Sequence, residues 1–311
     1  MSITLNNITK SYKKVTAVEN ISFDVKQGEL FGLIGPDGAG KTTLFRILTT
    51  LLFADKGEAT VAGYDVVKDY KKIRNSVGYM PGKFSLYQDL TVEENLEFFA
   101  TIFGTTVEEN YDLIKDIYVQ IEPFKKRRAG KLSGGMKQKL ALSCALIHKP
   151  KVLFLDEPTT GVDPVSRKEF WDMLKRLNDK GITTLVSTPY MDEASLCDRI
   201  ALIQAGKILK IDSPANIIDQ HEKQIFNVKA HDMHAVITDL KEFPGNESIY
   251  AFGEFVHYTH SNSDFSPENL KRYLSEKGHK DIRIEPTTPG IEDVFMDLAR
   301  TKDLKPAANE V

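Results

Sequence analysis

The alternation of apolar and polar residues predicts short β-strands at the start of the chain. Three stretches, SITLNNIT (2–9), ISFDV (21–25) and ELFGLIG (29–35), are rich in β-branched and aromatic residues. The third stretch runs directly into GPDGAGKTTLFRILTTLL (35–52), in which glycines precede a helix-like pattern. This order predicts a strand, a glycine-rich loop and a helix in succession.

Further along, strand-like and helix-like patterns alternate. VGYM (77–80) predicts a strand, and Thr91 and Glu94 have the spacing of a capping box at the start of a mostly helical stretch that reaches about residue 149. The remaining predictions are a strand in 151–157, an amphipathic helix in 163–178 with Trp171 on its packed side, a strand in 181–188, and a hairpin in 199–210 around Ala205-Gly206. Strands separated by helices predict an α/β fold with a mainly parallel sheet.

After about residue 212 the composition changes, and strand-like stretches alternate with short helical ones without further glycine loops. We therefore expect a first domain at 1–212, with a helical part at about 84–149, and a small C-terminal α+β domain at 220–311. The length of 311 residues is sufficient for both.

Charge and cysteine content narrow the classes of function. A formal net charge of −3 gives no electrostatic reason to expect a nucleic-acid partner. Cys144 and Cys197 stand in apolar surroundings without a CxxC pattern, which predicts buried thiols and neither a disulfide nor a metal site. The sequence has no signal-peptide pattern and no apolar run long enough to span a bilayer, so we expect a cytosolic chain unless another chain brings it to a membrane.

Two motifs predict phosphate chemistry. GPDGAGKT (35–42) matches the complete phosphate-loop pattern, whose glycines turn backbone N–H groups toward phosphates. Lys41 is placed to reach the β- and γ-phosphates, and the Thr42 hydroxyl is placed to bind Mg²⁺. In KVLFLDE (151–157) two carboxylates end a buried strand, where Asp156 fits a magnesium ligand and Glu157 fits a general base for an attacking water.

With LSGGMKQKLAL (132–142) and GVDP (161–164), these motifs make residues 1 to about 212 resemble the ATP-binding-cassette (ABC) ATPases. The resemblance implies a P-loop cassette fold, ATP and Mg²⁺ as cofactors, and two cassettes that dimerise head to tail, each completing the other's site. Asp163-Pro164 also predicts a capped helix start. The residues implied to contact nucleotide are Tyr12, stacking on adenine, then Gly35, Pro36, Asp37, Gly38, Ala39, Gly40, Lys41, Thr42 and Thr43, and, across the dimer, Ser133, Gly134, Gly135 and Asp163.

Three positions depart from the family pattern. Asp37 replaces the usual asparagine, Gly82 replaces a glutamine that contacts magnesium and water, and Pro189 replaces a histidine that contacts the γ-phosphate. Pro189 also suits the first position of a helix through Tyr190–Ala194. Removing one such electrostatic contact typically slows a reaction by about 10²- to 10³-fold, so we expect ATP binding with slow hydrolysis at this site.

The segment around 84–104 corresponds to the family's docking segment for a membrane subunit, and PGIEDVFMDLA (289–299) resembles the tail of drug-export ATPases. The resemblance is to ATPase subunits of ABC-2-type exporters. It implies an integral-membrane permease as partner, a second cassette in a homodimer or, favoured by the incomplete site, a heterodimer, and a location on the cytoplasmic face of the membrane. The alternative left open is a non-transport ABC protein that acts as an ATP-dependent regulatory or assembly factor.

Overall fold

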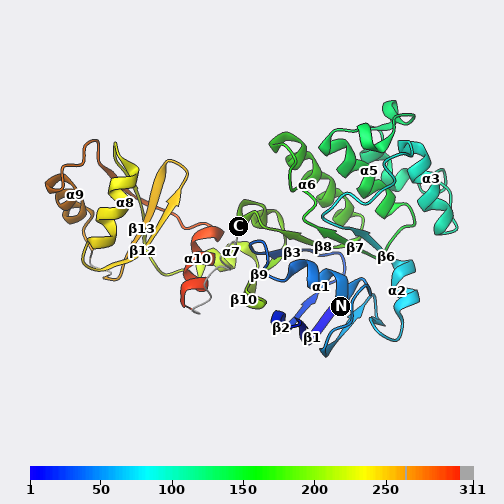
Figure 1. The fold of residues 1–311 in the computed structure, drawn as a ribbon, viewed down its shortest axis with the longest axis horizontal. Helices are drawn as coiled ribbons and strands as arrows, with labels where there is room; N and C mark the ends of the chain where they lie inside the picture. Colours follow the sequence, from blue (N-terminus) through cyan, green and yellow to red (C-terminus); the bar gives the residue numbers. More distant parts are fainter. Residues whose placement is uncertain (263–264, 302–311) are drawn as a thin grey trace. The chain divides into compact units, whose positions relative to one another are not determined.

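The computed structural model of the chain describes residues 1–262 and 265–301, which divide into two structural units (Figure 1). The first covers Met1–Pro214, and the second begins at Ala215. Within the described residues, no helix combines the length and the apolar character needed to cross a membrane.

A six-stranded sheet forms the centre of the first unit. Its order is β10-β9-β3-β8-β7-β6, and all neighbours are parallel except β10 and β9. Every residue of β3, β7 and β8 is buried, which explains the mainly apolar sequence of β3 and β7, whereas β8 also buries threonines and a serine. The strands are β3 (Leu30–Ile34), β6 (Val77–Met80), β7 (Val152–Asp156), β8 (Thr183–Thr188), β9 (Arg199–Gln204) and β10 (Lys207–Asp212).

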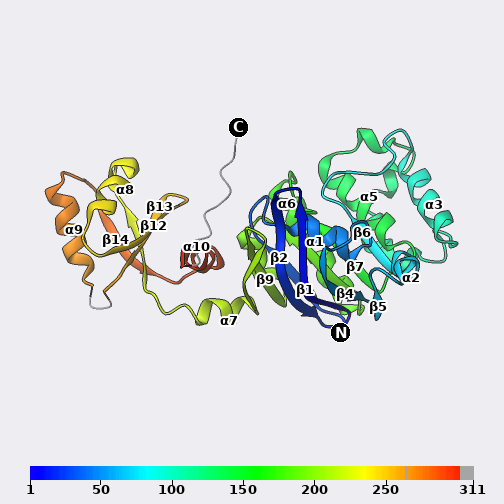
Figure 2. The same ribbon diagram turned by 60° about the horizontal axis from the view of Figure 1, so that its bottom comes forward.

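A second, antiparallel sheet lies beside the central one, with the order β2-β1-β4-β5 (Figure 2). Helix α1 (Lys41–Leu48) packs its buried residues into an apolar core to which both sheets contribute. The phosphate-loop helix is therefore held by two sheets. The strands are β1 (Ile3–Tyr12), β2 (Val15–Val25), β4 (Lys56–Val61) and β5 (Tyr64–Asp65).

Helices make up most of the segment between β5 and β7. They are α2 (Tyr70–Ser76), α3 (Val92–Ile102), α4 (Tyr111–Tyr118) and α5 (Gly134–Leu146). The predicted capping box is confirmed, because Thr91 Oγ1 accepts the Glu94 N–H at 3.2 Å and Glu94 Oε2 accepts the Thr91 N–H at 2.7 Å. Both orphan donors at the start of α3 are thereby satisfied.

The helix α6 (Pro164–Asp179) follows β7 and packs against β3 and β8. As predicted, Asp163 caps it, since its Oδ1 accepts the Ser166 N–H at 3.0 Å and Pro164 occupies the first turn. Trp171 is only 2 % exposed, which confirms that it packs in the core. The predicted hairpin between β9 and β10 is also confirmed, with Ala205 and Gly206 at φ 46° and 75°.

The second unit has the order β11-α8-β12-β13-α9-β14, after a short helix α7 (Pro214–Asp219). Its sheet order, β12-β13-β11-β14 with antiparallel neighbours, is that of a split β-α-β fold of ferredoxin type. Both α8 and α9 contribute to the core on one sheet face. The elements are β11 (Ile225–Lys229), α8 (Met233–Glu242), β12 (Asn246–Phe252), β13 (Phe255–His260), α9 (Pro267–Glu276) and β14 (Arg283–Thr287).

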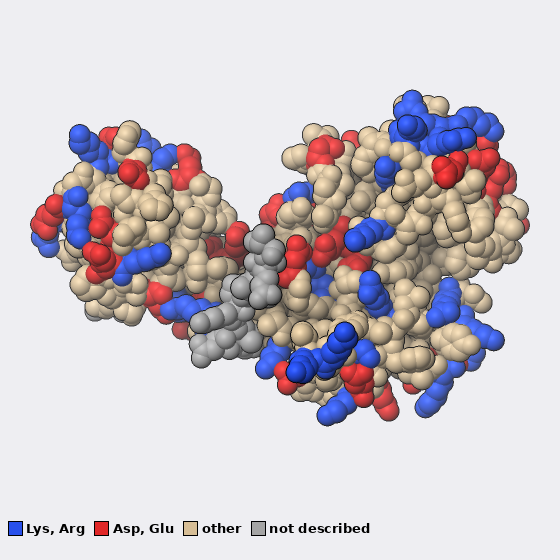
Figure 3. Space-filling model, in the orientation of Figure 1, with Lys and Arg blue, Asp and Glu red and all other residues tan. Residues whose placement is uncertain are grey.

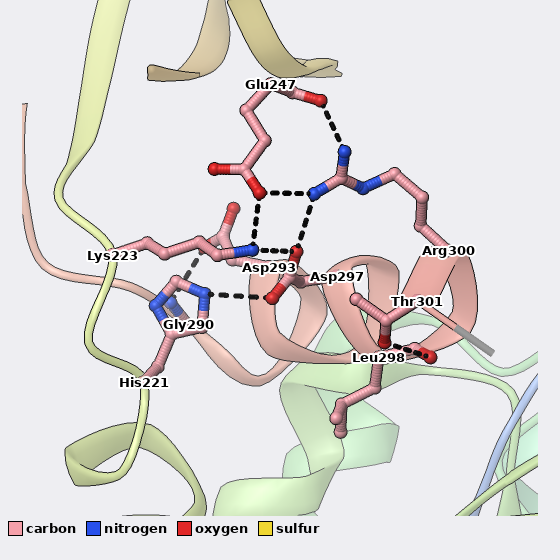
Figure 4. A network of polar contacts seen from close by, with 9 residues as sticks. All are labelled: His221, Lys223, Glu247, Gly290, Asp293, Asp297, Leu298, Arg300 and Thr301. Carbon is pink, nitrogen blue, oxygen red and sulfur yellow. Dashed lines mark hydrogen bonds and ion pairs between the residues drawn. The ribbon is translucent and has the colours of Figure 1, made fainter. Parts of the chain in front are cut away.

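The last described helix, α10 (Ile291–Thr301), is attached to this unit by charged contacts (Figure 4). Lys223 Nζ lies 2.6 Å from Asp297 Oδ1 and 2.8 Å from Glu247 Oε1, while Arg300 reaches Glu247 at 2.8 Å and Asp297 at 3.1 Å. Because Glu247 belongs to β12 and Asp297 to α10, this network connects the helix to the sheet.

Candidate functional site

The loop between β3 and α1 lies at the carboxyl end of the parallel strands, where open α/β sheets bind ligands. Gly38 and Gly40 have φ values of 76° and 104°, which favour glycine. At Gly35 a Cβ would lie 2.1 Å from the Ile203 carbonyl oxygen, so no side chain fits there. The Gly35 N–H donates to the Thr188 carbonyl at 3.2 Å, which attaches the loop to the end of β8.

The ammonium group of Lys41 is enclosed by this loop. Lys41 is 3 % exposed, and its Nζ donates to the carbonyl oxygens of Gly35 at 2.7 Å and Pro36 at 3.0 Å. The same Nζ lies 3.1 Å from Glu157 Oε1. The structure therefore brings together the predicted phosphate-binding lysine and the predicted general base.

The other predicted loop residues are arranged around this lysine. Asp37 is exposed, whereas Ala39 is buried and its carbonyl accepts the Gly206 N–H at 3.1 Å. Thr42 and Thr43 are half-buried at the start of α1, and among the described residues neither hydroxyl makes a hydrogen bond. The Thr42 hydroxyl thus remains available for an external ligand.

Asp156 ends β7 and is 3 % exposed. Its Oδ1 accepts the Ser187 hydroxyl at 2.7 Å, and Ser187 stands opposite it in the register of β7 and β8. Burial, with a contribution from Asp156, raises the pKa of Tyr79 to about 12. Ser187 holds this carboxylate in one orientation. Ser187 was not predicted as a site residue, and the available signal was its place near the carboxyl end of a predicted strand.

Glu157 has a left-handed backbone, with φ 51°. For a non-glycine residue this costs about 1–2 kcal/mol and is common where function fixes a side chain. Its N–H is held by the end of β8, because it donates to the Ser187 hydroxyl at 3.0 Å. The strand pair β7–β8 therefore fixes the carboxylate of Asp156 and the backbone of Glu157.

Pro189 follows β8, and its predicted place at the first position of a helix is wrong. The next helix is a 3-10 helix, Met191–Leu196, with Tyr190 at its N-cap. Thr188 makes the turn instead, since its Oγ1 accepts the Tyr190 N–H at 3.1 Å and donates to Glu193 Oε2 at 2.5 Å. Helix initiation therefore does not account for Pro189.

Gly82 lies beside the same two carboxylates. A Cβ at this position would lie 3.1 Å from the Asp156 carbonyl oxygen and 3.8 Å from Glu157 Cβ. The φ of Gly82 is not in the left-handed region, so the backbone does not require glycine. A residue without a side chain thus borders the acidic pair, at the position where the resemblance implies a glutamine.

Ser133, Gly134 and Gly135 start α5, and Ser133 Oγ accepts the Met136 N–H at 3.4 Å. A Cβ at Gly135 would lie 2.8 Å from Ser166 Oγ, in the first turn of the helix that Asp163 caps. The structure thus places these three residues beside the Asp163 segment. The ring of Tyr12, at the end of β1, is 43 % exposed.

Comparison with known proteins identifies the family. Residues 18–160 match the family model described as ABC transporter. The chain is 34% identical over 303 residues to the "Nod factor export ATP-binding protein I" of Rhizobium sp. (strain N33), covering 96% of this chain and 97% of that protein. The chain belongs to the ABC transporter ATP-binding proteins. The predicted family, and with it the class of ABC-type ATPases, is confirmed.

A longer relative is the "Probable multidrug ABC transporter ATP-binding protein YbhF" of Escherichia coli (strain K12), 38% identical over 302 residues. The match covers 95% of this chain and 52% of that protein, so the chain spans about half the length of this relative.

Solved structures agree with the predicted cassette fold. The ATP-binding cassette MJ0796, in a dimeric post-hydrolysis state bound to ADP and Pi, aligns with a TM-score of 0.62 and 27% identity, over 68% of this chain and 98% of that one. An ATP-binding subunit of an ABC transporter aligns with a TM-score of 0.65 and 26% identity, over 71% and 93% of the two chains. The predicted α/β cassette fold is thereby confirmed.

Proposed function

We propose that this chain is the nucleotide-binding subunit of an ABC exporter and that its own site hydrolyses ATP slowly. The observation that carries the proposal is a pair of residues that offer no polar side chain to a ligand, Pro189 directly after β8 and Gly82 beside Asp156 and Glu157. The phosphate loop and the predicted magnesium ligands and general base remain available for a nucleotide. We therefore infer a site that binds ATP but hydrolyses it slowly.

The phosphate loop suits the phosphates of ATP, because its glycine backbone and the enclosed Lys41 Nζ present donors to anions. When bound, ATP supplies the phosphoryl group that passes to water, and Mg²⁺ neutralises phosphate charge. The Thr42 hydroxyl and the Asp156 carboxylate, which Ser187 orients, would hold the cation.

Glu157 would accept the proton of the attacking water. Its carboxylate is paired with Lys41 Nζ at 3.1 Å. The ammonium group of Lys41 must therefore exchange this carboxylate for a phosphate oxygen before Glu157 can accept a proton. Pro189 has no polar side chain with which to hold the γ-phosphate or the base. We therefore assign the slow step to this missing contact.

The residues Ser133, Gly134, Gly135 and Asp163 would complete the site of a second cassette across a head-to-tail dimer. They support this role because the start of α5 presents backbone N–H groups and a hydroxyl beside the Asp163 segment. A partner with a complete site would then hydrolyse ATP normally. The incomplete site of this chain favours such a heterodimer over a homodimer.

A membrane permease would dock beside α3, which places the chain on the cytoplasmic face of the membrane. An apolar cavity of about 460 Å³ there is lined by Met80, Leu86, Phe99 and Phe103, among others. Met80 ends β6 and lines this cavity, and Gly82 follows two residues later beside the acidic pair. The same short stretch of chain thus borders both the docking segment and the nucleotide site, which supports coupling between ATP hydrolysis and transport.

The turnover of ATP by the purified chain alone tests the proposal. We expect tight ATP binding with a rate at least about 10²-fold below that of a complete cassette, since an electrostatic contact is missing. Glu157→Gln serves as the control for contaminating ATPase. Turnover as fast as that of a complete cassette would refute the slow-site proposal.

A further inference from the structure

Exposed apolar and basic side chains lie together around α2, separate from the residues of the nucleotide site. Leu51, Phe53 and Val67 are 57 %, 68 % and 53 % exposed. Figure 3 shows Lys and Arg side chains gathered at the edge of the molecule where Figure 1 places α2. We call this surface the α2 patch, and it consists of Leu51, Phe53, Val67, Lys68, Tyr70, Lys71 and Arg74.

Contacts of Arg74 hold the two segments of the patch together. Its Nε donates to Thr50 Oγ1 at 2.8 Å, and its Nη2 donates to the Thr50 carbonyl oxygen at 2.9 Å. Its guanidinium carbon lies 5.3 Å from the ring centroid of Tyr70. The loop that carries Leu51 and Phe53 is therefore fixed beside the exposed side of α2.

The patch carries an excess of positive charge. Residues 64–76 contain four basic residues and two aspartates, a net charge of +2 in a chain whose net charge is −3. Within the described residues, Lys68, Lys71 and Arg74 form no ion pair with a carboxylate. The fourth cation, Lys72, pairs with an aspartate at 2.8 Å. Three cations are thus available to an anionic partner.

We propose that the α2 patch binds the surface of a membrane that contains anionic phospholipids. Such a surface offers phosphate anions to the basic residues and acyl chains to Leu51 and Phe53. Tyr70 has an amphipathic ring among basic groups, an arrangement typical of membrane–water interfaces. A nucleic acid also offers phosphates, but it would leave the aliphatic side chains of Leu51 and Val67 exposed to water. Lipid therefore fits the patch better.

The patch adjoins the apolar cavity beside α3, because Leu51 and Arg74 also line that cavity. Phe53, Lys68 and Lys71 do not line it and stay available to lipid. A chain bound to a permease would thus present these residues to the lipid headgroups around the permease. This location rests on the proposed exporter function, but lipid binding by the chain itself does not.

Co-sedimentation of the purified full chain with vesicles tests the proposal. We expect binding to mixed phosphatidylcholine and phosphatidylglycerol vesicles that weakens as salt rises, and binding at least about tenfold weaker to phosphatidylcholine alone. Lys68→Gln with Lys71→Gln should weaken binding to the mixed vesicles by about tenfold, because two unpaired cations are lost. Lys168→Gln with Lys175→Gln removes the same charge from exposed positions of α6 and should leave binding unchanged.

Phe53→Trp tests whether the apolar side chains enter the lipid. The native tryptophan, Trp171, is 2 % exposed, so a change in emission reports the new indole. The emission should shift to shorter wavelength with the mixed vesicles, because an indole that enters the headgroup region leaves water. Val119→Trp, at an exposed position directly after α4, should show no shift.

Lipid binding would be overturned by absence of binding, by equal binding to neutral vesicles, by an equal loss in the α6 variant, or by an unshifted emission of Phe53→Trp. Lys68→Gln with Lys71→Gln could instead leave vesicle binding unchanged and weaken association with the detergent-solubilised permease. That result would assign the patch to a protein partner and also overturn the proposal. Failure of the wild-type chain to associate with the permease would contradict the exporter function, and the vesicle titration would still decide lipid binding.

Discussion

At the scale of single residues, close contacts decide which side chains the nucleotide site accepts. Gly35 faces a carbonyl oxygen at a distance that excludes any Cβ, whereas Gly38 has a left-handed φ of 76° but open space around it. The two glycines are therefore needed for different reasons, one steric and one conformational.

This difference predicts unequal effects of alanine. Gly35→Ala should lower the free energy of unfolding by more than about 2 kcal/mol, because β3 and β9 must separate. Gly38→Ala should cost only about 1 kcal/mol, from its backbone conformation. Urea denaturation of both variants measures the difference, and equal losses would contradict the steric explanation.

The ion pair between Lys41 and Glu157 gives a second prediction. Glu157→Gln removes the general base, so residual hydrolysis should fall by at least about tenfold. ATP should bind as tightly or more tightly, since Lys41 no longer has a competing carboxylate. Single-turnover kinetics and equilibrium binding measure both effects. Glu169→Gln, an exposed position on α6, should change neither, and weaker ATP binding in Glu157→Gln would contradict this account.

Contacts between residues close in the sequence could be predicted from motifs, whereas contacts between residues far apart in the sequence could not. The capped start of α6 at Asp163 followed from two adjacent residues. The contact between Ser187 and Asp156 depends on the register of two strands, which no local pattern reveals. The role of Pro189 was misread because Thr188 makes the turn with its side chain.

At the scale of elements, the start of α3 depends on a few hydrogen bonds. Thr91→Ala should lower the free energy of unfolding by about 1 kcal/mol, because the Glu94 N–H at the first turn loses its partner. Thr101→Ala, near the exposed end of the same helix, should stay within about 0.5 kcal/mol of wild type. Equal losses in thermal or urea unfolding would argue against the cap.

The attachment of α10 should depend on pH. The ammonium of Lys223 lowers the pKa of Glu247, and Arg300 adds to the effect. A lowered pKa in the folded state means that the stabilisation is complete above the unfolded value of about 4.3 and is lost as pH falls below it. Protection factors of α10 amides in hydrogen exchange should therefore fall between about pH 5 and pH 3.

The control for this prediction is Lys223→Met, which removes the partner that lowers the pKa of Glu247 most. The pH dependence of α10 protection should become shallower in this variant. A protection factor that does not change with pH, or that changes as steeply in the variant, would contradict the role of the ion network.

Most helices and strands could be predicted because the residue pattern within each one matches the structure that it adopts. Wholly buried strands such as β3 and β7 have mainly apolar sequences, and the hairpin at Ala205-Gly206 has its own turn signal. The attachment of α10 was not predictable, because its partners Lys223 and Glu247 lie far from Asp297 along the chain.

At the scale of the whole molecule, the chain keeps the cassette fold and the phosphate loop, and we propose that it lacks contacts at its own catalytic edge. The fold and the family are shown by the comparisons. The slow site and the complete second cassette are proposals that share one premise, namely that Gly82 and Pro189 limit hydrolysis. The membrane subunit is a separate proposal, which the apolar cavity beside α3 supports.

Restoring both side chains tests this premise most directly. The measurement is the ATP turnover of Pro189→His with Gly82→Gln, compared with Pro189→Ala with Gly82→Ala, which adds the same Cβ at position 82, 3.1 Å from the Asp156 carbonyl oxygen. We predict that the histidine and glutamine variant hydrolyses ATP faster than wild type by about 10²-fold and that the alanine variant does not. Unchanged turnover in a restored variant that binds ATP normally would contradict the account.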